Sequence, residues 1–422
     1  MFDAESNVGI NTYITKTEGI GGTIKEKPED FTVEEILKIK LSDEGQFTVI
    51  KVKKINWDTL NFVRVLAKKL KISQKRIEYA GTKDKRAVSI QYFTIYGLNE
   101  EQLKKLKNVK IKDAEITVLG KSKNRISLGN LLGNKFRILV KNTSNEDKIE
   151  DILVEINEKG CPNFFGLQRF GTMRYITHKV GLEILRRNYE EAFWIYVAMP
   201  FEGENLEIRK IREELWESRN PVIGLKEYPA YLRYERILLQ ALREGKTEEQ
   251  ALLRLPKNLK LMFVHAYQSY VFNRVLSERI KEFGNLKILD KDDYVGFFKE
   301  ENDINVIRDE YYPVEWRYRR VNYLIKVKRA GLAIPLPGYE TELRGWTGKM
   351  LKDILDEDNI SLEDFRHEHA EFSSRGNYRL AEIPYTQFNY KTYEKSVEFK
   401  FKLPKGCYAT VLLREFTKTC IF

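Results

Sequence analysis

The chain has 422 residues, a net charge of +11 and 12% aromatic residues, a combination that predicts two domains and a polyanionic partner. It contains no apolar run close to the length of a membrane-spanning helix, and its first ten residues lack the order of a signal peptide, so we expect a cytoplasmic protein. Cys161, Cys407 and Cys420 are too widely spaced to predict a disulfide framework or a zinc site.

Residues 23–37 predict a turn that leads into a strand. Pro28 is expected to close the turn, and Phe31 and Val33 then alternate with polar residues. Lys25 precedes the turn, and Glu35 follows the apolar alternation. From the charge pattern alone, Lys25 is as consistent with a solvated surface lysine as with a functional one.

Residues 56–71 predict an amphipathic helix, because Leu60, Val63 and Ala67 belong to one apolar stripe. The basic residues of this segment lie away from the stripe, where they would either contact an RNA backbone or simply face solvent. Ser73 is expected to cap a short second helix.

The stretch from Ala80 to Ile90, AGTKDKRAVSI, places one carboxylate, Asp84, among basic residues at the start of a predicted strand. Gly81 allows a sharp turn, and neighbouring positive charges favour the ionised form of an aspartate. An ionised carboxylate beside a phosphodiester could serve as a nucleophile or as a base. A solvated turn in which Asp84 only balances charge explains the same pattern.

Between residues 99 and 159 the sequence predicts helices and strands at 99–106, 114–119, 125–128, 133–140 and 145–159, of which the first and last are helices. The fourth of these segments reads GNKFRILV, and Phe136, Ile138 and Val140 share one face of the strand. An aromatic residue on a strand belongs to the core by default. Asn134 lies two residues before Phe136.

Residues 163–174, NFFGLQRFGTMR, combine two Phe-Gly steps with one glutamine and two arginines. This composition suits a tight loop that binds phosphate and stacks on bases. Gln168 and Arg169 are its candidate RNA contacts. A packed turn with surface arginines has the same composition.

The second half of the chain predicts a long, mostly helical region and then strands. Helices are expected at 177–197, 228–243 and 258–283, with a capping box at Thr247 and Gln250 between the last two. Residues 287–345 are expected to be strand-like and irregular, and later strands are expected at 378–386 and 395–403, followed by a C-terminal helix. The sequence HEHAE at 367–371 lacks the histidine pair of a zinc-binding helix, so we expect no metal site.

Five of these segments, in this order, resemble the motifs of the TruD family of tRNA pseudouridine synthases, in its archaeal-type form. They are residues 25–37, 80–91, 133–138, 163–171 and 401–416. The second segment is similar to the family's motif of glycine, lysine, aspartate, a basic residue and alanine. The last segment departs from the pattern at Cys407, where a serine is usual and a hydroxyl hydrogen bond would be weakened.

The resemblance implies that Asp84 is the catalytic aspartate, acting as a nucleophile at the sugar or the base, or as a base at the ribose 2′ position. It leaves Glu35 as a structural or an active-site carboxylate. It also implies that Lys25 is an active-site lysine, that Asn134 hydrogen-bonds near the target nucleotide and that Phe136 packs on the uracil face. Gln168 and Arg169 are implied to serve in RNA binding or active-site support.

The fold that the resemblance implies is α+β. Its catalytic domain, residues 1–165 and 376–422, would hold a mixed, mainly antiparallel sheet flanked by helices, and residues 166–375 would form a helix-rich α+β insertion domain. The activity implied is isomerisation of a uridine in tRNA, at position 13 of the D-arm, to pseudouridine, with no metal or other cofactor. A non-catalytic RNA-binding protein with this fold is the alternative, and a DNA-binding regulator is disfavoured because no clear helix-turn-helix or zinc-finger pattern is present.

Overall fold

The computed structural model describes residues 4–419, so Cys420 lies outside the described residues. The chain divides into two compact units. The sheet unit consists of Thr15–Asn157, Phe297–Asp309 and Ile383–Phe422, and the helical unit of Met1–Ile14, Glu158–Gly296 and Glu310–Glu382. Among the described residues, no helix is both long and apolar enough to cross a membrane.

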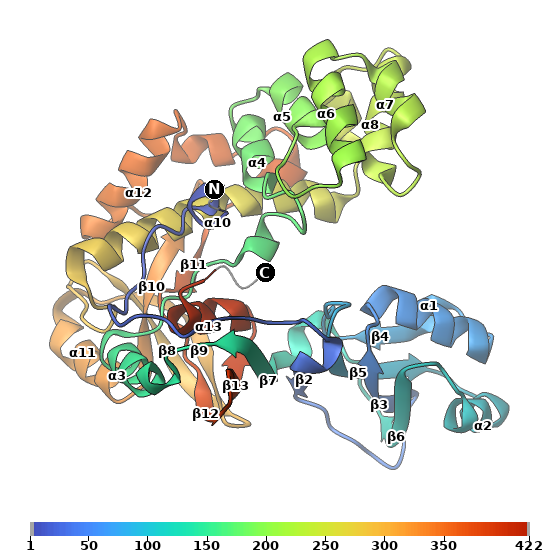
Figure 1. The fold of residues 1–422 in the computed structure, drawn as a ribbon, viewed down its shortest axis with the longest axis horizontal. Coiled ribbons are helices and arrows are strands. Elements are labelled where there is room, and N and C mark those ends of the chain that lie inside the picture. The colour runs from blue at the N-terminus through green and yellow to red at the C-terminus, as the bar shows by residue number, and fades with distance from the viewer. Residues whose placement is uncertain (1–3, 420–422) are drawn as a thin grey trace. The chain divides into compact units, whose positions relative to one another are not determined.

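A nine-stranded sheet forms the framework of the sheet unit (Figure 1). Its strands are β1 (Gly21–Thr23), β2 (Phe31–Leu37), β3 (Phe47–Ile55), β4 (Ile77–Tyr79), β5 (Val88–Tyr96), β6 (Ala114–Ser122), β7 (Leu131–Thr143), β12 (Thr386–Tyr393) and β13 (Ser396–Pro404). Their order is β12-β13-β7-β2-β5-β3-β6, with β1 paired to β7 and β4 to β5. Because β2 and β5 run parallel while the other neighbours in this order are antiparallel, the predicted mixed, mainly antiparallel sheet is confirmed.

Helices pack against this sheet. They are α1 (Thr59–Leu70), α2 (Glu100–Asn108), α3 (Ile149–Lys159) and α13 (Ala409–Thr417). Asp58 starts α1 by accepting a hydrogen bond from the Asn61 amide. Phe62 and Leu66 of α1 then pack against Phe93 of β5 in a fully buried core, and burial of each such side chain contributes roughly 1.5–3 kcal/mol. This core supports β4 and the part of β5 that pairs with it.

The helical unit is helix-rich α+β, as predicted. Its helices are α4 (Thr177–Leu185), α5 (Tyr189–Ala198), α6 (Leu206–Ser218), α7 (Pro221–Glu227), α8 (Arg233–Arg243), α9 (Glu248–Leu253), α10 (Lys257–Phe283), α11 (Tyr318–Lys326) and α12 (Gly345–Glu357). A second sheet has the order β11-β10-β8-β9, from β8 (Tyr294–Glu301), β9 (Ile304–Pro313), β10 (Ala330–Leu336) and β11 (Asn377–Leu380). The helical unit contains β10, β11, the first residues of β8 and the last residues of β9, whereas Phe297–Asp309, which includes the rest of β8 and β9, belongs to the sheet unit. The long α10, yellow in Figure 1, runs alongside β10.

The predicted strand at 125–128 is wrong. Residues 125–127 form a loop, and a short 3₁₀ helix follows at Leu128–Asn130. The Ile126 amide donates to the Thr94 hydroxyl (3.0 Å), and the Asn130 side chain accepts from the Ser127 amide (2.7 Å). These side-chain acceptors satisfy backbone groups that a strand would pair with a neighbouring strand.

The single helix predicted at 177–197 is also wrong, because the chain breaks between α4 and α5. Arg187 adopts a left-handed conformation with φ 58°, which ends α4. Asn188 then caps α5 by accepting from the Glu191 amide. In the region from 287 to 345, three strands agree with the prediction, whereas α11 was not predicted.

Candidate active site

Asp84 lies in the loop that joins β4 to β5. The first half of the loop is held by hydrogen bonds, since the Lys83 amide donates to the Thr59 hydroxyl (3.0 Å) and the Gln91 side-chain amide donates to the Gly81 carbonyl (2.9 Å). The Asp84 side chain is nevertheless 49% exposed. A backbone held by hydrogen bonds therefore presents this carboxylate to solvent.

Lys25 follows β1 and brings its ammonium to Asp84. The Nζ atom lies 3.0 Å from Oδ2 of Asp84, and the Lys25 side chain is only 17% exposed. The same ammonium lies 4.3 Å from the centroid of the Phe31 ring, within the range of a cation–π interaction. The structure thus brings Lys25 and Asp84 together, and their parts in catalysis stay predictions.

A buried polar network lies next to this pair. Its contacts were not predicted from the sequence. Nζ of Lys83 is 2.6 Å from Oε1 of Glu35, and the two side chains are 8% and 0% exposed. Gln91 donates to the same Glu35 oxygen (3.2 Å), and the Tyr92 amide donates to the other one (3.2 Å). Glu35 therefore ties Lys83, the residue before Asp84, to the sheet.

Lys54 on β3 is a second buried cation near this network, and the sequence analysis missed it. Its side chain is fully buried, and Nζ donates to the Ser89 hydroxyl (2.7 Å). Burial, followed by repulsion from the Lys83 ammonium, lowers the pKa of Lys54 to about 8, against attraction from carboxylates that include Asp84. Strand alternation could have indicated this burial, because Lys54 continues the buried face that Val52 occupies.

Phe136 and Asn134 lie on one face of β7, two residues apart. Phe136 is buried between two rings, in edge contact with Phe31 (centroids 6.0 Å apart) and tilted against Phe401 (5.5 Å). Asn134 pairs with Glu35 across β7 and β2. Its Oδ1 atom is buried, and among the described residues it has no hydrogen-bond partner. Such an atom is unfavourable without a donor, so it suits a ligand that supplies one.

These contacts form one continuous group on a single face of the sheet. Phe31 contacts both the Lys25 ammonium and the Phe136 ring. Glu35 lies opposite Asn134 and binds the lysine next to Asp84. The group joins an exposed carboxylate, a cation, two buried aromatic rings and a buried acceptor. These are the kinds of side chain that an enzyme acting on a flipped nucleobase uses.

Gln168 and Arg169 lie in the helical unit, in a 3₁₀ helix at Leu167–Arg169. Gln168 is exposed. Arg169 donates from Nε to the Ser269 hydroxyl (3.0 Å) of α10, and its Cζ lies 5.6 Å from the centroid of the Phe165 ring. These contacts secure the loop against α10, and an RNA-binding part for Gln168 and Arg169 stays a prediction.

One group of three potential metal ligands occurs in the described part of the chain. Ligand atoms of Glu249, Glu368 and His369 lie within 4.8 Å of one another. Nε2 of His369 is 2.7 Å from Glu249, and the Tyr189 hydroxyl donates to Glu368 (2.5 Å). Protein partners thus account for the positions of all three side chains, and the expectation of no metal site stays a prediction.

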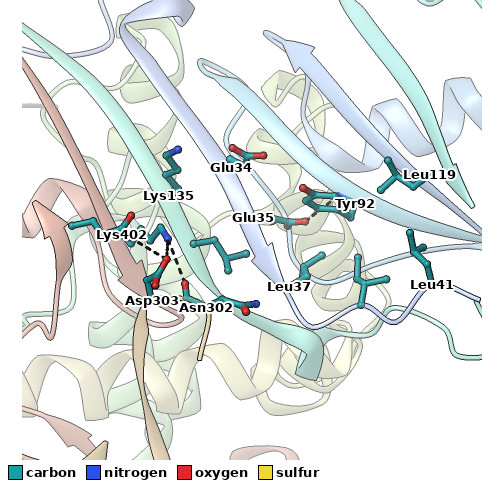
Figure 2. Close-up of a pocket in the computed structure, with 13 residues that line it drawn as sticks. Glu34, Glu35, Leu37, Leu41, Tyr92, Leu119, Lys135, Asn302, Asp303 and Lys402 are labelled. Atoms are coloured by element: carbon teal, nitrogen blue, oxygen red, sulfur yellow. Dashed lines mark hydrogen bonds and ion pairs between the residues drawn. The ribbon is translucent and has the colours of Figure 1, made fainter. Parts of the chain in front are cut away.

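A cavity of about 570 Å³, shown in Figure 2, is lined mostly by side chains of the other face of the sheet, although Glu35 of the candidate site also belongs to its lining. Glu34 pairs with Lys135 across β2 and β7, and Lys135 pairs with Lys402 across β7 and β13, so these side chains alternate with those of the candidate site. Lys402 forms an ion pair with Asp303 (2.9 Å). Asp84 is not part of the lining of this cavity, and we do not assign the cavity to the chemistry.

Comparisons with known proteins agree along almost the whole chain. The sequence model of the family described as "tRNA pseudouridine synthase D (TruD)" matches residues 7–416. A protein of Archaeoglobus fulgidus, named "Probable tRNA pseudouridine synthase D", is 56% identical over 98% of this chain and 99% of its own length. A Methanosarcina acetivorans protein of the same name is 39% identical over 99% of this chain and 97% of its own length.

The three-dimensional comparison leads to the same family. A crystal structure of a Methanosarcina mazei protein assigned to TruD matches with a TM-score of 0.83 at 37% identity. The match covers 99% of this chain and 98% of that one. The chain therefore belongs to the TruD family of tRNA pseudouridine synthases.

Proposed function

We propose that this protein converts a uridine of tRNA, at position 13 of the D-arm, into pseudouridine, with Asp84 as the carboxylate that acts on the nucleoside. Family membership and the names of the relatives support the reaction and the substrate class. The contact between Asp84 and Lys25 is the observation that carries the assignment of Asp84, because it holds an exposed carboxylate in a defined position in a protein of net charge +11.

The proposed reaction is an isomerisation and balances without a second substrate. The bond from C1′ to N1 breaks, the uracil rotates, and a bond forms from C1′ to C5, while C5 loses a proton and N1 gains one. Asp84 acts as a nucleophile at the sugar or the base, or as a base at the ribose 2′ position. In each route the Lys25 ammonium orients the carboxylate.

The target uridine has to leave its stack before Asp84 can reach it. Phe136, whose ring contacts Phe31, packs on the uracil face and replaces the lost stacking. Oδ1 of Asn134 accepts a hydrogen bond from a uracil N–H, which accounts for a buried acceptor that has no partner among the described residues.

We propose further that residues 1–165 and 376–422 act as the catalytic domain and residues 166–375 as the insertion domain. Gln168 and Arg169, at the start of the proposed insertion domain, contact the RNA. The exposure of Gln168 and the guanidinium of Arg169 support this assignment.

Mapping of pseudouridine in an unmodified tRNA transcript tests the proposal. Purified protein that has been stripped with EDTA should form pseudouridine at position 13, and a transcript with cytidine at that position should gain none. A protein that binds the transcript without forming pseudouridine would favour the non-catalytic alternative. Loss of activity on EDTA treatment, restored by one metal, would contradict the expectation that no cofactor takes part.

A further inference from the structure

The segment Glu315–Arg329 of the helical unit is strongly basic and exposed. It contains six cationic side chains and a single acidic one, Glu315. The cationic residues are Arg317, Arg319, Arg320, Lys326, Lys328 and Arg329, all exposed. Within the described part of the chain none of the six forms an ion pair, and of the six only Lys328 is shown to interact electrostatically with a carboxylate, that of Glu382. We call the exposed side chains of this segment the α11 surface.

The helix α11 is anchored through its other face. Val321 and Ile325 are buried, and the Asn322 side chain both accepts from the Leu289 amide (2.8 Å) and donates to the Leu289 carbonyl (2.9 Å). These contacts fix which residues of α11 face solvent. The direction of its charged side chains is therefore set by the fold.

Along the exposed side of α11, cations and an aromatic ring form a stripe. Arg319, Tyr323 and Lys326 follow one another at positions i, i+4 and i+7, which places them on the same side of a helix. Seven residues of helix span roughly 10 Å. Such a stripe can meet more than one phosphate of a nucleic acid strand.

Aromatic rings stand beside these cations. Trp316 is 78% exposed and Tyr323 is 63% exposed. The Arg317 guanidinium lies over the Trp316 ring, with Cζ 5.0 Å from its centroid. Exposed aromatic rings among arginines are typical of surfaces that bind single-stranded RNA, where bases stack on the rings and phosphates pair with the cations.

We propose that the α11 surface binds an unpaired segment of the RNA substrate, with Arg319 and Arg320 on phosphates and Trp316 stacked on a base. The inference rests on the proposed function for the nature of that substrate. A membrane surface fits less well, because an interfacial helix requires a free apolar face. The apolar side chains Val321 and Ile325 of α11 are already buried in the helical unit.

Affinity for a tRNA transcript, measured over a salt series, tests the proposal. Arg319→Ser with Arg320→Ser should weaken binding about 5-fold or more and reduce the slope of log Kd against log salt by about 1.4. The matched control, Lys104→Ser with Lys107→Ser, removes the same charge from the exposed face of α2. It should leave the affinity within about 2-fold of wild type, as expected of solvated lysines.

Trp316 is tested separately. Trp316→Ala should weaken binding about 5-fold or more, because stacking on one base is lost, whereas Trp316→Phe keeps a ring and should retain most of the affinity. These side chains are exposed, so unchanged thermal unfolding is expected and confirms that the variants are folded. Unchanged affinity in both the arginine and the tryptophan variants would overturn the proposal, as would a loss equal to that of the α2 control.

The outcome is separable from that of the proposed function. If wild-type protein forms pseudouridine and the substituted proteins bind RNA as tightly as wild type, only the proposal for the α11 surface is contradicted. Wild-type protein that binds tRNA through α11 without forming pseudouridine contradicts only the proposed function. Binding to phosphatidylserine vesicles that depends on Arg319 and Arg320, with unchanged tRNA affinity, would identify a membrane surface and overturn the proposal.

Discussion

Lys25 and Asp84 meet across 59 residues of sequence, with Nζ 3.0 Å from Oδ2. The lysine is 17% exposed and the aspartate 49% exposed, so the cation is mostly enclosed and the carboxylate is accessible. A partly exposed ion pair of this kind contributes about 0–1 kcal/mol to stability. Its geometry is therefore better suited to orienting a reactive carboxylate than to holding the fold together.

Replacement of Lys25 by methionine tests this interpretation. The rate of pseudouridine formation should fall by about 100-fold, because the carboxylate loses its orienting partner. The free energy of unfolding should change by less than about 1 kcal/mol. Single-turnover assays and urea unfolding measure the two quantities, and Lys27→Met, at an exposed position two residues away, should behave as wild type. A fully active Lys25→Met protein would remove Lys25 from the mechanism.

Replacement of Asn134 by alanine distinguishes a functional role of this residue from a structural one. Because Oδ1 of Asn134 has no partner among the described residues, Asn134→Ala breaks no hydrogen bond at that atom and should change the free energy of unfolding by less than about 1 kcal/mol. Its rate of pseudouridine formation should nevertheless fall by about 10-fold or more, because the uracil loses a contact that positions it.

Ile138 on the same strand provides the contrasting variant. It is fully buried and faces Phe31 across β7 and β2. Ile138→Ala should destabilise the protein by about 2–5 kcal/mol and retain its rate at temperatures where it stays folded. If Asn134→Ala behaved in this way instead, Asn134 would be a structural residue.

The Lys83–Glu35 pair predicts a loss of stability. Glu35→Gln leaves a lysine that is 8% exposed without a carboxylate partner, so the free energy of unfolding should fall by on the order of 3 kcal/mol. The control is Glu101→Gln, which breaks the Lys105–Glu101 pair. That pair also spans 2.6 Å, but its side chains are 44% and 75% exposed, and its loss should have no measurable effect. Equal effects of the two substitutions would show that burial of the Glu35 network contributes nothing.

Lys54 predicts a dependence of stability on pH. Its pKa in the folded protein is about 8, below the ordinary value of 10.5, so between these pH values the unfolded chain binds more protons at this residue. Stability rises with pH wherever the unfolded state binds more protons. As the pH rises across this range, the free energy of unfolding of wild type should therefore increase relative to that of Lys54→Met, by up to roughly 3 kcal/mol.

Urea unfolding of both proteins between about pH 7 and pH 10 measures this difference directly. Lys53→Met is the control, because Lys53 is the neighbouring lysine of β3 with its side chain 46% exposed. It should show no such trend. A constant difference between wild type and Lys54→Met across the range would contradict the lowered pKa.

Local patterns predicted many of the elements. The capping box of Thr247 with Gln250 and the long α10 appear in the structure. The helix α1 also appears, with Val63 and Ala67 of the predicted apolar stripe buried, but Leu60 of that stripe is 63% exposed. Predictions failed where non-helical backbone or a tertiary contact decided the outcome. The left-handed Arg187 splits one expected helix, and the contact of Ile126 with Thr94 replaces an expected strand.

The candidate site was predictable only in part, because some of its residues stand in local sequence motifs and others do not. Asp84, Lys25 and Asn134 stand in motifs, so the family resemblance implies one site that contains all three. Lys53 and Lys54, by contrast, are neighbours with the same local charge, and only the register of β3 sends one to solvent and the other into the interior. The partners of Lys54 come from strands and loops that no local pattern brings together.

The most direct test of the whole account is the rate of pseudouridine formation by Asp84→Asn, measured together with its affinity for tRNA. The variant keeps the size of the side chain and removes the carboxylate. We predict no detectable pseudouridine while the affinity stays within about 2-fold of wild type, since an exposed residue contributes little to the fold. Formation of pseudouridine by Asp84→Asn at the wild-type rate would contradict the proposal that this carboxylate acts on the nucleoside.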